Sequence, residues 1–537
     1  MSKNCSWLIA FIMEKTKDFI KKHLNDDVNK LALSKFPEDI DKQFVIRQIQ
    51  ARQVLSKKLP SWAENDELIF PKKLSLEQCS SELTAKYKAL LSSTKPHEST
   101  RKISDDSCDL VDEKMSTKLH EMTRKISEDS CDLVDEKMST KPHETSRKIS
   151  EDSCILVDEK MSTNQHESTR KISDDSCILV DEKRILVDLT GGMGVDTAFL
   201  SDNFDKTYYV EMQEELCEIA RHNFKILNKN IEVVNDNAEH FLTICDEVDC
   251  IYLDPARRDE YGRKMVSLHD CSPDVAELHD ILLKKAKNVL VKLSPMLDID
   301  VVKKELKNIT EIHIVAVRNE CKEILLEIQK LKNSKTQKLK ISATQQLGNS
   351  TTHNLSNSAT QQLIISATDL REGWNFSFTE DEEQNAEWTL ADKVGKYLYE
   401  PGVAFMKAGC FKLLSQRFNI DKLHRNSHLY TSDELVPDFP GRIFEVVCTV
   451  PFDKKTKKNL FETQRHKDAK TQSGKNSATL RLCDSATSKK ASVATRNFPL
   501  SADELRKHLG LQDGGDFYLF GTTMKGEKKV VVLARKK

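Results

Sequence analysis

A glycine-rich turn near the middle of this 537-residue chain has the composition of a ligand-binding loop. Between a β-branched run and an apolar helix start, the chain reads Asp188-Leu189-Thr190-Gly191-Gly192-Met193-Gly194. Glycines in such a turn let the backbone approach a ligand closely, and the free N–H groups of the helix start point at it. The order of residues therefore predicts a strand, a binding turn and a helix.

Two carboxylates end the next two predicted strands. Glu211 lies 23 residues after Asp188, where an acid can accept hydrogen bonds from both hydroxyls of a ribose, although it also fits an ordinary strand end. Asp236 ends the third strand and is placed to bind near an adenine. The rival is a dinucleotide site, which needs Gly-x-Gly-x-x-Gly/Ala. A frame begun at Gly192 has Thr197 at the last of these positions, so the rival fits poorly.

A polar motif follows the fourth predicted strand, at the strand end where open α/β sheets place their chemistry. It reads Asp254-Pro255-Ala256-Arg257-Arg258, and we predict Asp254, Pro255, Arg257 and Arg258 as its reaction-site residues. The two arginines can grip a phosphate, with a salt-bridged loop as the alternative. After the fifth strand, Lys292, Ser294 and Pro295 form either the wall of an acceptor pocket or a plain loop.

Together these motifs resemble those of the class I S-adenosylmethionine (SAM)-dependent methyltransferases. Their first motif, Asp-x-Gly-x-Gly-x-Gly, matches residues 188–194, with Thr190 in place of the first glycine. The resemblance implies SAM as the cofactor. It also implies that the backbone from Gly191 to Gly194 lies along the methionine moiety, that Glu211 binds the ribose, and that Asp236 lies at the adenine edge.

The Asp254 motif resembles the (Asp/Asn/Ser)-Pro-Pro-aromatic motif of amino-methyltransferases. In those enzymes the carboxylate or amide accepts hydrogen bonds from the substrate –NH₂ and orients its lone pair at the SAM methyl, which is catalysis by positioning. Here Asp254 and Pro255 are retained, Ala256 stands for the second proline, and Arg257 stands for the aromatic ring. An arginine plane can also stack on a base, and Tyr261 follows closely. The resemblance implies methyl transfer and leaves the acceptor atom open.

The pattern around these motifs is typical of an α/β fold. Short β-branched runs alternate with amphipathic stretches over 184–330, which predicts a Rossmann-like domain with a mostly parallel seven-stranded sheet. The predicted strands are 185–187, 207–210, 231–234, 250–253, 289–291, 312–315 and 324–326. Residues 1–92 have helical spacing and predict an N-terminal helical region. Residues 367–537 predict small α+β domains, with a helix capped by Ser501 and strands at 517–520 and 530–533.

Three biased segments interrupt these regions. Residues 93–183 repeat a 23-residue unit, with Arg-Lys-Ile-Ser at 101, 124, 147 and 170, as recent tandem duplication would produce. Each unit holds too few large apolar residues to offset the entropy of ordering it. We therefore predict a mostly disordered insertion, with a small repeat domain as the alternative. Residues 331–366 and 467–495 are predicted to be polar insertions.

Composition limits the partners and the compartment. The formal net charge is −2, and none of the fourteen cysteines lies in a Cys-x-x-Cys pair or in zinc-like spacing with histidine. We therefore predict neither a metal site nor a disulfide framework. The apolar run 7–13 is too short to span a bilayer and predicts the start of a helix. The sequence predicts a soluble, cytoplasmic protein without a membrane partner and leaves the oligomeric state open.

Longer motifs narrow the resemblance to a methyltransferase family known mainly from Bacteroidetes. They lie at 188–196, 254–258, 319–323, 397–401, 426–432 and 496–501. In that family a ferredoxin-like domain, here 367–466, and a THUMP-like domain, here 496–537, follow the methyltransferase domain. Because THUMP domains occur in RNA-modifying enzymes, the resemblance implies an RNA partner. Residues 453–496 carry twelve Lys/Arg against four Asp/Glu, which fits either a phosphate-tracking surface or a solvated insert.

These features predict an enzyme that transfers a methyl group from SAM to a base of tRNA or rRNA, at an exocyclic or ring nitrogen such as guanine N2. One alternative is a methyltransferase of proteins or small molecules. Another is a non-catalytic RNA-binding protein with a vestigial SAM pocket. The intact Gly191, Gly194 and Asp254 argue against a vestigial pocket, whereas Thr190 and Ala256 leave it open.

Overall fold

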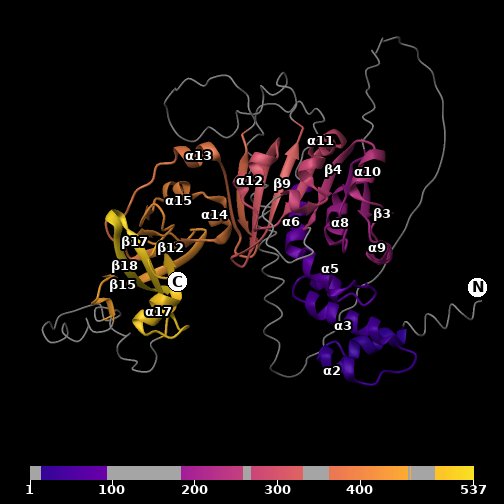
Figure 1. Ribbon diagram of the computed structural model, residues 1–537, viewed down its shortest axis with the longest axis horizontal. Helices are drawn as coiled ribbons and strands as arrows, with labels where there is room; N and C mark the ends of the chain where they lie inside the picture. Colours follow the sequence, from indigo (N-terminus) through magenta and orange to yellow (C-terminus); the bar gives the residue numbers. More distant parts are fainter. Residues whose placement is uncertain (1–13, 94–182, 258–267, 331–361, 458–459, 461–489) are drawn as a thin grey trace, which may run out of the picture.

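The computed structural model describes residues 14–93, 183–257, 268–330, 362–457, 460 and 490–537. The apolar run 7–13, nearly all of the tandem repeat and most of the two polar insertions lie outside the described residues. The described parts comprise a group of N-terminal helices, a large sheet with helices on both faces, and a second, C-terminal sheet (Figure 1).

The large sheet has nine strands in the order β11-β10-β8-β9-β7-β4-β1-β2-β3. Its strands are β1 (Ile185–Asp188), β2 (Lys206–Glu211), β3 (Ile231–Asn235), β4 (Val248–Leu253), β7 (Ala286–Leu293), β8 (Ile309–Val317), β9 (Glu320–Gln329), β10 (Ile364–Asp369) and β11 (Trp374–Thr379). Neighbours from β3 to β7 run parallel, whereas β9 runs antiparallel to both β7 and β8.

All seven predicted strands fall within this sheet, which confirms the Rossmann-like α/β fold. The predicted number of seven is too low by two, because β10 and β11 extend the sheet beyond β8. β10 pairs in parallel with β8, and β11 pairs antiparallel with β10. Both strands follow a long insertion, so no local pattern in the sequence could show that they pair with β8 rather than with later strands. The sheet therefore extends past the predicted boundary at residue 330.

Helices cover both faces of this sheet. On one face α10 (Ala238–Ile244), α11 (Val275–Lys285) and α12 (Ile299–Glu305) pack on a core that includes Val187, Ile251 and Val289. On the other face lie α6 (Glu82–Ser93), α8 (Val195–Leu200) and α9 (Glu214–Ile226). Side chains of Asn237, Asp274 and Asp298 accept backbone N–H groups and so cap α10, α11 and α12. Short elements between them are η1 (Ser201–Asn203), β5 (Ala256–Arg257), η2 (Leu268–Asp270) and β6 (Cys271–Ser272).

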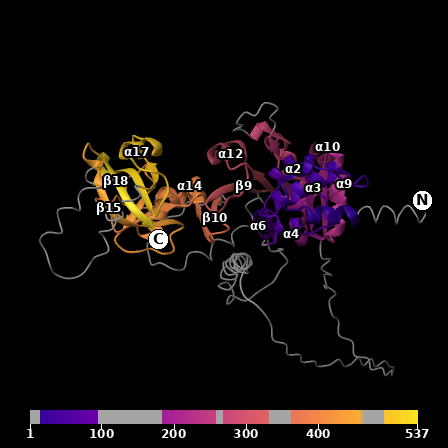
Figure 2. The same cartoon turned by 90° about the horizontal axis from the view of Figure 1, so that it is seen from below.

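The N-terminal region is helical, as predicted. It comprises a helix over 14–22 and then α2 (Val28–Leu33), α3 (Lys42–Leu55), α4 (Pro60–Ala63), α5 (Lys73–Gln78) and α6. Trp62 and Phe70 share a core with Phe224 of α9, so these helices lie against the sheet domain (Figure 2). The last helix, α6, packs along α8. It thereby brings the N-terminal region next to the glycine-rich turn.

The C-terminal part has a seven-stranded sheet in the order β13-β14-β12-β15-β18-β17-β16. Its strands are β12 (Tyr397–Pro401), β13 (Asp421–Lys422), β14 (Tyr430–Ser432), β15 (Gly441–Pro451), β16 (Ser492–Arg496), β17 (Phe517–Met524) and β18 (Lys528–Lys536). Its helical elements include α13 (Glu380–Asn385), α14 (Val403–Ala408), α15 (Phe411–Phe418), α17 (Ala502–Leu509) and η3 (Lys525–Glu527). This confirms the α+β character, and Ser501 caps α17 in a capping box with Glu504, as predicted.

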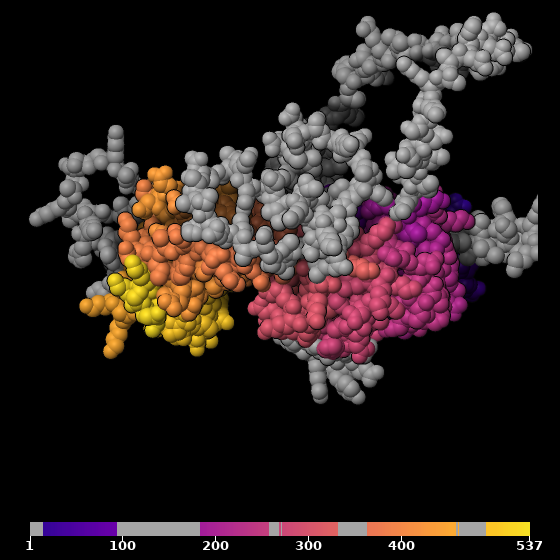
Figure 3. Space-filling model, turned by 90° about the horizontal axis from the view of Figure 1, so that it is seen from above, coloured from indigo at the N-terminus to yellow at the C-terminus, as the bar shows by residue number. Residues whose placement is uncertain are grey.

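The two sheets are joined through α14, which contacts β8, β9 and β10. One hydrophobic core runs from Ile314 and Ala367 of the large sheet to Phe405 of α14 and Leu414 of α15. The two parts lie side by side in the space-filling view (Figure 3). None of the described helices combines the length and the apolar character that crossing a membrane requires.

Candidate cofactor and reaction site

The predicted site residues gather at the carboxyl edge of the parallel strands. Asp188 ends β1, Glu211 ends β2, Asp236 follows β3, and Asp254 follows β4. Carboxyl ends of neighbouring parallel strands meet at one edge of a sheet, so residues far apart in sequence come together there. Each of the four is linked to another part of this edge by a hydrogen bond, as described below.

The glycine-rich turn is shaped by left-handed residues and by two rings packed behind it. Gly192 and Gly194 have φ angles of +54° and +79°, which favour glycine. A Cβ on Gly191 would lie 2.2 Å from a ring carbon of Tyr209, and one on Gly194 would lie 2.7 Å from the ring of Phe224. A Cβ on Gly192 would meet nothing closer than 3.7 Å. Packing therefore requires glycine at 191 and 194, whereas Gly192 leaves the turn open toward a ligand.

Glu211 connects this turn to β2. The side chain is buried, and its Oε2 and Oε1 each accept a backbone N–H at 2.9 Å, from Gly192 and Gln213 respectively. A carboxylate has about four acceptor positions, so two stay available for the hydroxyls of a ribose. The geometry fits the predicted ribose contact, and it also gives Glu211 a structural role that the sequence did not suggest.

Asp236 lies next to Glu211, since its own N–H donates to the Glu211 carbonyl at 3.2 Å. Its carboxylate accepts the N–H of Asn237 at 2.8 Å and contacts His240 Nδ1 at 2.6 Å. The hydrogen bond with His240 lowers the pKa of Asp236. The carboxylate is therefore held in its ionised form, as an acceptor at the predicted adenine edge needs to be.

Thr190 joins the glycine-rich turn to the reaction motif. Its Oγ1 accepts the backbone N–H of Asp254 at 2.6 Å and lies 3.5 Å from Asp188 Oδ1, to which it can donate. Asp254 Oδ2 forms an ion pair with Lys292 of β7. The sequence alone fits Lys292 either as part of a pocket wall or as a plain loop residue. The structure instead places it in a strand, paired with the carboxylate of the reaction motif.

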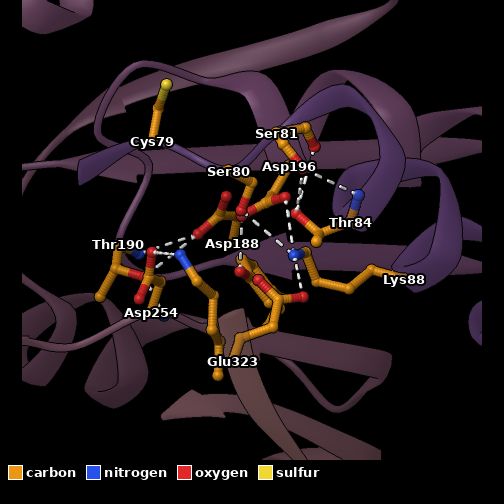
Figure 4. Close-up of polar contacts among 12 residues, drawn as sticks. Cys79, Ser80, Ser81, Thr84, Lys88, Asp188, Thr190, Asp196, Asp254 and Glu323 are labelled. Atoms are coloured by element: carbon orange, nitrogen blue, oxygen red, sulfur yellow. Dashed lines mark hydrogen bonds and ion pairs between the residues drawn. The ribbon is translucent and has the colours of Figure 1, made fainter. Parts of the chain in front are cut away.

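A buried network of charges lies behind this pair, and it includes a residue of the N-terminal region (Figure 4). Lys88 of α6 has no exposed surface, and its Nζ lies 2.8 Å from Glu323 Oε1 on β9 and 3.2 Å from Asp196 Oδ1 on α8. Ser80 and Tyr252 both donate to Asp196 Oδ2 at 2.7 Å. Sequence reasoning missed Lys88, and its only signal is a lysine on the same helical face as Ala85 and Thr84.

The network changes the protonation of its members. Burial would lower the pKa of Lys292, but Asp254, Asp196 and Glu323 raise it above the usual lysine value. Burial raises the pKa of Asp188 to about 7, with a further contribution from Asp196 and Asp254, against the hydrogen bonds from Thr197 and Thr190. Lys292 is thus a fixed cation, and Asp188 titrates near neutral pH.

The remaining residues predicted for the reaction motif are only partly within the described part of the chain. Pro255 is buried directly after Asp254, and Arg257 lies in β5, but the Arg257 side chain, Arg258 and Tyr261 are outside the described residues. Two methionines at this edge were not singled out by sequence. Met212 and Met296 follow Glu211 and Pro295, and they are 70% and 64% exposed. Both methionines are thus exposed next to residues of the candidate site.

The chain is similar to one solved structure along nearly its whole length. A crystal structure from Porphyromonas gingivalis W83, described as a candidate methyltransferase, is 26% identical, and 98% of each chain is covered with a TM-score of 0.64. This chain has a methyltransferase fold. Residues 397–440 match a ferredoxin-like domain model, and residues 471–536 match a THUMP-like domain model. These matches confirm the family resemblance seen in the motifs.

Other solved structures match only a short part of the chain. An rRNA methylase from Streptococcus thermophilus and a methyltransferase-like protein from Streptococcus mutans solved with SAH are each 18% identical. Each match covers 28% of this chain and 90% of the other, with a TM-score of 0.22. At that score the two matches carry no argument about function. No curated protein matches the chain. The THUMP-like match begins well before residue 496, and the domain boundaries remain predictions.

Proposed function

We propose that this protein is a SAM-dependent methyltransferase whose acceptor is a nitrogen of an RNA base. The observation that supports the proposal most is the hydrogen bond from Asp254 N–H to Thr190 Oγ1, because it joins the predicted reaction motif to the predicted cofactor turn. Glu211 and Asp236 lie along the same sheet edge. This is the order in which a SAM-binding fold needs its methionine, ribose and adenine contacts.

The residues present fit the cofactor. The turn is open at Gly192, and Glu211 keeps free acceptor positions for a diol. When bound, SAM supplies an electrophilic methyl group on a positively charged sulfur. Met212, exposed beside Glu211, would cover an apolar face of the adenine. Asp196, Asp254 and Glu323 outnumber Lys88 and Lys292 even when Asp188 is protonated, so the charge at this edge is negative and complements a cation.

Asp254 is the residue that would orient the acceptor. Its Oδ2 is held by Lys292, which leaves Oδ1 to accept a hydrogen bond from a substrate –NH. Holding the nitrogen lone pair in line with the methyl group is the main contribution. As the new N–C bond formed, the bond between the methyl group and the cofactor sulfur would break, and the amine proton would pass to solvent water. Lys292 is a fixed cation, so it positions Asp254 and does not act as the base.

The RNA part of the proposal rests on the C-terminal domains. The THUMP-like match at 471–536 and the excess of lysine and arginine over 453–496 both support a phosphate-binding surface. The missing aromatic ring at Arg257 leaves the base undetermined, and guanine N2 is our best single candidate.

The test uses the full-length purified protein. Calorimetry with SAM measures cofactor binding, and transfer of labelled methyl to RNA, protein and small-molecule fractions of a strain lacking the gene measures activity. Nucleoside mass spectrometry then identifies the methylated base. We expect SAM binding and label in RNA, with Asp254→Ala abolishing transfer while SAM binds normally. Asp280→Ala is the matched control, because Asp280 is 92% exposed on α11.

Each outcome separates the candidates. Label in protein or in small molecules would select the second function class, with the C-terminal domains serving assembly. RNA affinity without SAM affinity would select a binding protein with a vestigial pocket. No SAM binding by the intact chain contradicts the proposal outright.

A further inference from the structure

Three potential metal ligands lie together on the face of the large sheet that α6 covers. They are Glu311 and His313 of β8 and Glu327 of β9, and one ligand atom from each lies within 4.8 Å of the other two. His313 is 3% exposed and Glu327 is 9% exposed, whereas the Glu311 side chain is 27% exposed. The cluster is thus buried, with one member reaching toward solvent.

The two glutamates are direct partners across the β8–β9 ladder. Like charges placed directly opposite one another destabilise a sheet, and burial makes their repulsion stronger. A cation or a proton close to the two carboxylates relieves this repulsion. His313 is two residues from Glu311 on the same strand, so its ring projects from the same face.

One nitrogen of His313 lacks a hydrogen bond. Its Nδ1 lies 3.2 Å from Tyr87 Oη of α6, a normal hydrogen-bond distance. Among the described residues no group forms a hydrogen bond with Nε2, although Glu327 Oε1 is 3.4 Å away. When Nδ1–H donates to Tyr87, Nε2 carries a lone pair that faces a carboxylate. That contact is repulsive unless Nε2 is protonated or a metal ion lies between the two atoms.

The spacing fits a metal ion. Two ligand atoms that are each about 2.1 Å from a tetrahedral ion lie about 3.4 Å apart, which is the distance between Nε2 and Glu327 Oε1. Glu311 needs a small side-chain movement to complete the set, and its partial exposure allows this. Ser366 of β10 donates to Glu311 Oε1 at 2.6 Å and lies 2.7 Å from Ser377 Oγ. Such outer contacts orient metal ligands, as Tyr87 does for His313.

We propose that Glu311, His313 and Glu327 bind a first-row divalent metal ion such as Zn²⁺ or Mn²⁺. One imidazole and two carboxylates suit these ions, and water fills the remaining positions. The site departs from the sequence prediction of no metal. The sequence shows only a Glu-x-His pattern on one strand, because the third ligand, Glu327, lies on the neighbouring strand.

The site lies apart from the reaction motif and has a structural role. Tyr87, which contacts His313, is adjacent to Lys88, which pairs with Glu323 on β9. Metal binding would therefore fix α6 against β8 and β9. It would stabilise the packing of the N-terminal region on the sheet without taking part in methyl transfer.

The experiment uses the untagged full-length protein, stripped with a chelator and then titrated with Mn²⁺ under electron paramagnetic resonance. Mn²⁺ favours nitrogen and oxygen ligands, so the cysteines compete little. We expect one tightly bound Mn²⁺ whose pulsed spectrum shows coupling to a histidine nitrogen. Absence of a bound ion, or a bound ion without that coupling, would overturn the site. A protonated His313 between two glutamates would then be the explanation.

Variants locate the ion. Glu327→Gln removes a charged ligand with little change in side-chain shape, and it should weaken Mn²⁺ binding at least about tenfold. Tyr87→Phe removes the hydroxyl that orients His313, and it should weaken Mn²⁺ binding by about tenfold. Glu320→Gln is the control, because Glu320 lies on the same strand with its side chain 72% exposed. Unchanged affinity in Glu327→Gln contradicts the proposal. If this variant fails to fold, the nitrogen coupling in the wild-type protein still decides the question.

Discussion

The hydroxyl of Thr190 bridges the two halves of the candidate site, accepting the Asp254 N–H at 2.6 Å while lying 3.5 Å from the carboxylate of Asp188. Thr190 is also the one departure from the glycine pattern of the first motif. A glycine here could not make either contact. The substitution therefore replaces backbone freedom with a hydrogen bond between the cofactor turn and the reaction motif.

Removing this hydroxyl should lower turnover and leave cofactor binding nearly unchanged. In Thr190→Val the Asp254 N–H loses its acceptor, so the position of the carboxylate loosens. A hydrogen bond of this kind contributes about 0.5–1.5 kcal/mol, which corresponds to a decrease in kcat of about two- to tenfold. Steady-state kinetics and calorimetry with SAM measure the two effects separately. Thr190→Ser keeps the hydroxyl and should keep kcat, and a larger loss in the serine variant would contradict the explanation.

Loss of the Lys292 cation should reduce turnover by about tenfold or more. Lys292→Met leaves Asp254 without its ion-pair partner and leaves Asp196 and Glu323 less well balanced. Neighbouring carboxylates raise the pKa of Lys292, so Lys292 keeps its proton between about pH 7 and 10. The pH–rate profile of the wild-type enzyme should therefore show no decrease from deprotonation of Lys292 over that range. The control is Lys287→Met, whose side chain is 52% exposed on the same strand. If the two substitutions lowered kcat equally, Lys292 would have no specific role in positioning Asp254.

Glu211→Gln should weaken SAM binding by about ten- to a hundredfold. The carboxylate accepts the N–H groups of Gly192 and Gln213, and a glutamine offers only one acceptor oxygen. Calorimetry measures the change. Glu218→Gln, on α9 with an exposed side chain, is the control and should bind SAM normally.

Truncation of Lys88 should destabilise the whole protein. Lys88→Met leaves Asp196 and Glu323 buried without their cation, which costs about 3–5 kcal/mol. Denaturant unfolding measures the loss, with Lys86→Met as the control, since Lys86 lies on the same helix with its side chain 41% exposed. Adding Glu323→Gln to Lys88→Met should recover part of the stability. A further loss in that double variant would mean that the pair does not act through charge.

The pKa of Asp188 predicts a pH dependence of stability. The folded-state value is about 7, above the ordinary value of 3.8, so the folded state holds a proton that the unfolded chain releases earlier. The stability from this group is complete below pH 3.8 and is lost as pH rises through about 7. Asp188→Asn should therefore gain stability relative to wild type over that range, by about 4 kcal/mol in total. Thermal unfolding of both proteins from pH 4 to 8 tests this, and a constant difference would contradict it.

Several features followed from local sequence because they depend on neighbouring residues. The strands of the Rossmann-like domain follow from β-branched runs, and the cap at Ser501 follows from Glu504 three residues later. The glycine turn and the strand-end acids Glu211, Asp236 and Asp254 follow from spacing, because each lies where a strand must end. Sequence alone therefore determined the fold class and the edge of the sheet that carries the candidate site.

Tertiary structure decided what those residues contact. The two additional strands, the buried Lys88, the pairing of Lys292 with Asp254 and the cluster around His313 all join segments far apart in the chain. The periodicity of a sequence cannot predict such contacts, because a buried charge is stable only where a partner from another element lies next to it. The sequence thus determined where chemistry is placed, and the packing of α6 and the sheet decided which charges surround it.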